Sequence, residues 1–206
     1  LMTHGRLTLI KAFVILACVL PFALLAARAF GYGSLGANPI QEVLHTLGKT
    51  GLNLLLITLA VTPARRLTGL KWLVALRRAL GLAVFAYILL HAVTYVVLDL
   101  RLAWSTFFAD VAQRPYITVG VAALILLVPL AVTSTNSMQR SLGRRWQKLH
   151  RLVYVISILG VVHFFWQVKI TTVEPLLYTF FLIVLLGFRA KDWLARASQR
   201  PAISKP

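Results

Sequence analysis

Two histidines, His91 and His163, lie deep inside long apolar segments of the sequence. An ionisable residue within a membrane span costs roughly 2.5 kcal/mol or more if charged, so it usually faces the interior of a helix bundle and marks a function. Counted along ideal helices from their basic flanks, His91 lies about 18 Å and His163 about 21 Å from the same end. Two neutral imidazoles at one depth can provide both axial ligands of a haem iron. The alternative is that each ring only hydrogen-bonds a neighbouring helix.

A third histidine, His150, precedes His163 by thirteen residues, which places it about 20 Å closer to the basic end of a continuous helix. The corresponding positions before His91 are Arg77 and Arg78, and guanidinium is not an ordinary haem ligand. Thirteen residues also turn an ideal helix by about 1300°, leaving His150 and His163 roughly 140° apart in azimuth. His150 therefore keeps three candidate roles: ligand of a second, inner haem with an unidentified partner, contact to a flavin or quinone, or cap of an interface network.

The arginines that flank the apolar segments at this basic end can be interpreted in two ways. Most act as topology signals, because Lys and Arg concentrate on the cytoplasmic side of membrane proteins. A few, with Arg77 and Arg78 as the candidates, could pair with the carboxylates or phosphates of a cofactor, since guanidinium forms bidentate contacts with such groups.

The remaining candidate ligands are few. His45 follows Glu42 near the start of an apolar segment and is expected at the membrane interface rather than on a metal, and His4 lies in the N-terminal tail. Cys18 is the only cysteine, so an internal disulfide, a Cys-x-x-Cys pair and covalent haem attachment are excluded. Any haem must be held non-covalently.

The elements that position these residues follow from composition. Of 206 residues, 59% are hydrophobic and 13% are charged, far from the roughly 25% charged residues of a soluble domain. Lipid leaves backbone groups unsatisfied unless the spans are helices, and the apolar segments lack the alternation of barrel strands. We therefore predict an all-α polytopic bundle that forms a single domain over residues 1–206, without space for a soluble catalytic domain. Six transmembrane helices are expected at about 7–29, 44–62, 79–98, 117–132, 149–168 and 175–188.

Charge distribution predicts the orientation. Seventeen of the 22 Lys and Arg residues flank the segments on one side and five on the other, which places both termini in the cytoplasm. The net charge of +17 thus needs no nucleic-acid partner. The first segment also resembles a signal peptide, but its apolar stretch is longer than the usual 7–15 residues, so we expect a retained helix.

Several motifs resemble the ferric-reductase-like transmembrane domain. They are residues 133–139, Thr-Ser-Thr-Asn-Ser-Met-Gln; residues 142–154, which contain Trp146 and His150; residues 78–82, which lead to His91; and residues 114–120. The resemblance covers about residues 36–190. It is more specific for the haem-binding membrane subunits of periplasmic methionine-sulfoxide reductase systems.

This resemblance implies a b-type cytochrome with His91 and His163 as axial ligands and His150 as the inner histidine. It implies electrons from a quinol or a cytosolic flavin reductase, and a periplasmic molybdopterin enzyme that reduces methionine sulfoxide in oxidised proteins as acceptor. The cofactors are then one or two b haems, with FMN or a quinone as a further candidate on the inner side. No substrate chemistry is expected on this chain. The third helix carries only His91, whereas wider members of the superfamily have two histidines there, so two symmetrical haems are in doubt.

Two other functions compete with electron transfer. A small transporter or channel could use intramembrane histidines as a relay, but the spans lack buried Asp and Glu and no internal repeat is evident. A metal-dependent membrane enzyme would need His and carboxylate ligands close together, and the acidic residues lie at helix ends.

Overall fold

The computed structural model describes residues 3–168 and 173–198, without the side chains of residue 4 and residues 192–198. All regular elements in these ranges are helical, which confirms the all-α prediction. They are α1 His4–Ala29, α2 Pro39–Thr68, η1 Lys71–Leu76, α3 Arg77–Thr94, η2 Tyr95–Asp99, α4 Trp104–Gln113, α5 Pro115–Val132, α6 Asn136–Leu142, α7 Arg144–Leu149, α8 Leu152–Gln167 and α9 Val173–Ser198.

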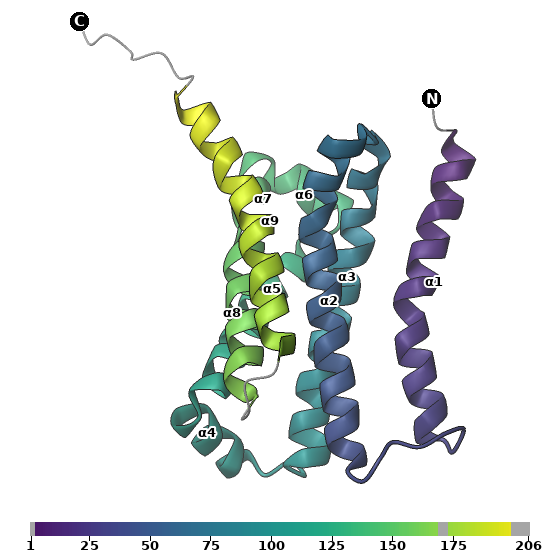
Figure 1. Ribbon diagram of the computed structural model, residues 1–206, viewed down its shortest axis with the longest axis vertical. Coiled ribbons are helices and arrows are strands. Elements are labelled where there is room, and N and C mark those ends of the chain that lie inside the picture. The colour runs from purple at the N-terminus through teal and green to yellow at the C-terminus, as the bar shows by residue number, and fades with distance from the viewer. Residues whose placement is uncertain (1–2, 169–172, 199–206) are drawn as a thin grey trace, which may run out of the picture.

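Six helical segments in these ranges are long and apolar enough to cross a membrane, which confirms the predicted number of spans. They cover Gly5–Ala29, Pro39–Thr68, Lys71–Asp99, Pro115–Val132, Arg144–Gln167 and Val173–Lys191. α1 begins and α9 ends at the same end of the bundle, which we call the basic end; the opposite end is the far end (Figure 1).

The predicted boundaries were wrong at several helices. α2 begins at Pro39 rather than near residue 44, because the side chain of Asn38 caps the amide of Gln41 and proline is well suited to the first helical position. The predicted helix at 149–168 is interrupted at His150 and Arg151, which separate α7 from α8. The arithmetic that placed His150 roughly 140° from His163 assumed a continuous helix and therefore fails.

The helices are arranged around two closely packed pairs, α2 with α3 and α5 with α8. α9 packs against α8 and α2, while α1 stands to one side against α3 and α2 (Figure 1). Buried Leu, Ile and Val side chains join the helices, among them Leu47, Val84 and Val161. The many apolar residues left exposed, such as Leu9 and Phe13 on α1, suit the lipid environment of a membrane protein.

Tyr87 of α3 anchors α1. Its hydroxyl donates to the carbonyl oxygen of Cys18 at 2.7 Å and accepts from the amide of Phe22 at 3.0 Å. Cys18 and Phe22 would bond each other directly in an ideal helix. Pro21 lies between them and lacks an amide hydrogen, so the backbone ladder is already weakened at this point. The inserted hydroxyl therefore satisfies both groups and links the two helices.

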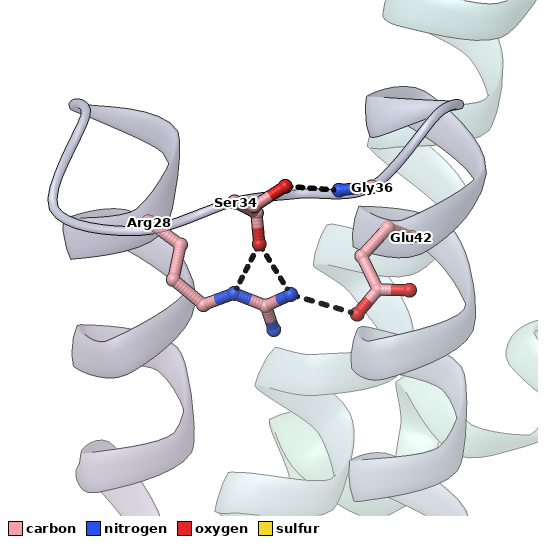
Figure 2. Close-up of polar contacts among 4 residues, drawn as sticks. All are labelled: Arg28, Ser34, Gly36 and Glu42. Carbon is pink, nitrogen blue, oxygen red and sulfur yellow. Dashed lines mark hydrogen bonds and ion pairs between the residues drawn. The ribbon is translucent and has the colours of Figure 1, made fainter.

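At the far end, Arg28 organises the loop between α1 and α2 (Figure 2). Its Nε and Nη2 donate to the carbonyl oxygen of Ser34 at 2.9 and 2.6 Å, and Nη2 forms an ion pair with Glu42 Oε1 at 3.3 Å. The Ser34 hydroxyl in turn accepts from the amide of Gly36 at 3.0 Å. Glu42 belongs to the first turn of α2, where a negative charge is favourable.

Candidate functional site

His91 of α3 and His163 of α8 lie side by side between the two helix pairs. Their ring centroids are 6.1 Å apart and their planes are inclined by 82°. The two residues are 72 positions apart in the sequence, and both are half-buried. The structure therefore brings together the two histidines that the sequence placed at one depth.

A backbone carbonyl orients each ring. His91 Nδ1 lies 2.9 Å from the carbonyl oxygen of Leu44 on α2, and His163 Nδ1 lies 2.7 Å from that of Tyr116 on α5. A carbonyl can only accept, so Nδ1 carries the hydrogen in each neutral ring, and Nε2 presents a lone pair. Histidine ligands of metals commonly have this arrangement. The bond to a neighbouring helix, first considered as an alternative to ligation, is thus compatible with it.

Two glycines make room for the rings. A Cβ atom built on Gly48 of α2 would lie 3.1 Å from His91 Nδ1, and one on Gly120 of α5 would lie 2.7 Å from His163 Nδ1. Real Cβ contacts are essentially never as short as the second distance. Each imidazole therefore lies directly against the backbone of the helix that supplies its carbonyl acceptor.

The same arrangement occurs twice in the chain. The first set is Leu44, Gly48 and His91 on α2 and α3, and the second set is Tyr116, Gly120 and His163 on α5 and α8. Each residue of the second set follows its counterpart in the first set by 72 positions. The two helix pairs thus present their imidazoles in equivalent ways. The repeat was missed in the sequence because three positions among apolar residues give too weak a signal.

The spacing of the rings suits a single metal between them. Two imidazoles that bind one metal from opposite sides, with metal–nitrogen bonds of about 2 Å, have centroids about 6 Å apart. The observed 6.1 Å agrees with this value. Within the described ranges there is no cluster of three or more His, Cys, Asp or Glu residues, so the geometry offers a pair of nitrogen ligands rather than a closed metal cage.

A second polar cluster lies toward the basic end, around Thr62 of α2. Arg77 Nη2 and Arg189 Nη2 both donate to its hydroxyl. Arg189 also donates to the carbonyl oxygen of Leu59 at 3.2 Å, a carbonyl that has lost its helical donor because Pro63 has no amide hydrogen.

The charges of this cluster are not balanced by the described side chains. The Nε atoms of Arg77 and Arg189 are buried without a hydrogen-bond partner, and none of the described ion pairs involves either residue. Two guanidinium groups on one hydroxyl repel each other, and both orphaned Nε atoms could donate to an anion. Arg77 was a candidate from the sequence. Arg189 and Thr62 were missed, because only the fold brings the last helix beside the second.

His150 is also near the basic end, in the turn between α7 and α8. Its ring stacks on Trp146 with centroids 3.8 Å apart, Nδ1 lies 3.1 Å from the Trp146 carbonyl oxygen, and Nε2 is buried without a partner. Arg78 does not join Arg77 at Thr62; it donates to the side chains of Asn136 at 2.5 Å and Gln139 at 3.1 Å. The two candidate arginines are therefore separated by the structure.

His45 lies at the far end, as expected for an interfacial residue. It is exposed, and its Nε2 lies 3.2 Å from Gln167 Nε2. It contributes no third nitrogen to the pair of His91 and His163 in any described contact.

Comparison with known proteins agrees with these features. Residues 47–161 match the family model described as "Ferric reductase like transmembrane component". The chain is 44% identical over 99% of its length to the "Protein-methionine-sulfoxide reductase heme-binding subunit MsrQ" of Xanthomonas oryzae pv. oryzae (strain MAFF 311018), covering 96% of that protein. Proteins of the same name from Xanthomonas axonopodis pv. citri (strain 306) and Azospira oryzae (strain ATCC BAA-33 / DSM 13638 / PS) are 46% and 44% identical, over 93% and 99% of this chain and 93% and 88% of theirs. The chain therefore belongs to the MsrQ family of multi-pass membrane proteins, within the ferric reductase like transmembrane components.

Proposed function

We propose that this chain is a b-type cytochrome subunit that carries electrons across the bacterial inner membrane to a periplasmic methionine-sulfoxide reductase. The observation that carries the proposal is the pair of imidazoles 6.1 Å apart, each oriented by a carbonyl from a different helix. The relatives support it, because their name describes them as haem-binding subunits of a methionine-sulfoxide reductase.

His91 and His163 are the proposed axial ligands of the haem iron. A haem bound there supplies reversible one-electron transfer. Leu44 and Tyr116 hold the two ligands in the tautomer that presents Nε2, and Gly48 and Gly120 let the rings approach the helices. Because His91 and His163 would both bind the iron, a haem held there would favour electron transfer over oxygen binding. Substrate chemistry would remain with the partner enzyme, which we propose to be the molybdopterin subunit.

The proposed orientation places the basic end and both termini in the cytoplasm. His91 and His163 then lie in the periplasmic half of the membrane, close to the electron acceptor. Electrons enter from the cytoplasmic side, from a cytosolic flavin reductase or from quinol.

For the inner side we propose a phosphate-bearing flavin, FMN, rather than a quinone or a second haem. Arg77 and Arg189 carry two positive charges and two buried, unpaired Nε donors, which suit a phosphate of charge about −1.5 to −2. A quinone has no such charge. A second haem would need a partner for His150, and the position equivalent to it on α3 holds Arg78. His150 would instead contact the flavin, while Arg78 supports the site through α6.

The haem assignment is tested by absorbance spectroscopy of the purified protein. Wild type should show a dithionite-reducible b-type spectrum, and His91→Ala or His163→Ala should abolish or strongly weaken it. His45→Ala is the matched control, because His45 is an exposed histidine at the same end and should leave the spectrum intact. Full spectra in both ligand variants would refute the assignment.

The inner-side assignment is tested by counting cofactors. Wild type should carry one haem and one flavin per chain, and Arg77→Gln or Arg189→Gln should lose flavin while keeping haem. Arg140→Gln, an exposed arginine on α6, should lose neither. Unchanged flavin in both arginine variants, or a quinone in place of flavin, would contradict the proposal.

A further inference from the structure

Three helices meet beside the histidine pair at the far end. Lys49 of α2 forms an ion pair with Glu174 of α9 at 2.8 Å, and one turn further along both helices the hydroxyl of Tyr178 donates to Asn53 Oδ1 at 2.6 Å. α9 is thus held in one register on α2. We call Lys49 and Glu174 the far-end charge pair.

One member of the charge pair, Lys49, lies beside residues that contact or flank the two proposed haem ligands. Lys49 follows Gly48, the residue against which the His91 ring lies. Its ammonium nitrogen is 6.0 Å from the ring centroid of Phe164, which follows His163 on α8. Lys49 therefore lies where α2 approaches the ligand-bearing part of α8. Neither of the other described ion pairs, Arg28 with Glu42 and Arg114 with Asp110, has a described contact with a residue adjacent to His163.

Water screens the charges of Lys49 and Glu174 only in part. The side chains of Lys49 and Glu174 are 41% and 43% exposed, so more than half of each is shielded from water. Charges near protein and lipid interact over longer distances than charges in bulk water, because the effective dielectric constant is lower. As a plain surface ion pair, by contrast, the two residues would contribute little to stability.

We infer that Lys49 and Glu174 act in opposite directions on the reduction potential of a haem held between His91 and His163, so that each charge cancels the shift that the other would cause alone. A haem gains one negative charge when it is reduced, so a nearby ammonium stabilises the reduced form and a nearby carboxylate destabilises it. Held together, the two largely offset each other. The inference rests on the proposed haem site and adds the residues that adjust its driving force.

A purely structural role for the pair makes a different prediction. Removing either partner breaks the same contact between α2 and α9, so any loosening of the haem site should change the potential in the same direction in both variants. An electrostatic role requires opposite directions, because the charge that remains has opposite sign. The sign of the shift therefore separates the two roles.

The experiment is a redox titration of the full-length protein in detergent, followed by its visible haem spectrum. Lys49→Gln should lower the midpoint potential and Glu174→Gln should raise it, while the double variant should return toward wild type. Lys49→Arg keeps the charge and should keep the potential. Glu42→Gln is the matched control, since it breaks the ion pair with Arg28 drawn in Figure 2, which belongs to the loop before α2.

The outcomes distinguish this inference from the proposed function. Opposite shifts in the two single variants, with no shift in Glu42→Gln, support it. A haem-containing protein whose potential is unchanged, or shifts in the same direction in both variants, overturns the inference and leaves the haem site standing. A wild-type protein without haem overturns both.

Discussion

Arg78 precedes His150 by 72 residues, the same interval that separates His91 from His163. At the far end, the two residues that are 72 positions apart are both histidines. Nearer the basic end, the two corresponding residues are an arginine, Arg78, and a histidine, His150. By this interval Arg78 is the sequence counterpart of His150, although Arg78 lies within α3 and His150 lies in the turn between α7 and α8. Arg78 is thus the residue that would limit this chain to the one haem that we propose.

This relationship predicts a gain of cofactor in Arg78→His. The variant should rise from one haem per chain toward two and lose flavin, because His150 Nε2, which has no partner now, would acquire an opposing ligand. Haem and flavin per chain are measured after extraction. Arg140→His, with a histidine on an exposed position of α6, should remain at one haem. A folded Arg78→His protein with unchanged haem content would argue against equivalence of the two positions.

The angle of 82° between the rings of His91 and His163 predicts the electronic structure of the ferric protein. Nearly perpendicular imidazoles interact with different iron d orbitals, which leaves those orbitals close in energy and makes a low-spin haem strongly anisotropic. We expect its electron paramagnetic resonance spectrum to show a highly anisotropic low-spin signal. An ordinary rhombic signal would mean that the bound ligands are closer to parallel.

The two glycines that hold the rings predict a graded loss of haem. Gly120→Ala places a methyl group 2.7 Å from His163 Nδ1 and should weaken haem binding by about 10-fold or more, as changes around a ligand commonly do. Gly48→Ala, at 3.1 Å from His91 Nδ1, should have the smaller effect. Haem content after purification is the measurement.

Gly81→Ala on α3 is the control for these variants. Apart from its two chain neighbours and the nearby backbone of α3, no atom lies within 4 Å of a Cβ at that position, so haem content should be retained, and the helix should gain up to about 1 kcal/mol. Equal haem content in all three alanine variants would show that the rings do not depend on close contact with the backbone.

The sequence predicted the parts of the site that depend on depth alone. Apolar segment length gave six spans, and counting residues from the basic flanks placed His91 and His163 at one level. The sequence could not show which distant segments come into contact. Leu44 and Tyr116 act through backbone carbonyls, which carry no signature in the sequence, and Arg189 reaches Thr62 only because α9 packs on α2. His150 lies near the basic end as predicted, but its azimuth was calculated for a continuous helix, and the break between α7 and α8 ends that helical register.

The two hydrogen bonds between Tyr87 and α1 predict that a substitution at Tyr87 will weaken the attachment of α1 to α3 without changing the haem site. In Tyr87→Phe the Cys18 carbonyl and the Phe22 amide can bond each other again, so α1 loses its link to α3 without keeping unsatisfied groups. Buried hydrogen bonds between membrane helices are worth about 0.6–2 kcal/mol, and unfolding in a denaturing detergent should become easier by that amount. The haem spectrum should not change, because the His91 ring is oriented by α2 and not by α1.

Tyr32→Phe, at a residue that is 84% exposed, is the control. Superimposable unfolding curves for both variants would show that the hydroxyl of Tyr87 does not hold α1 in place.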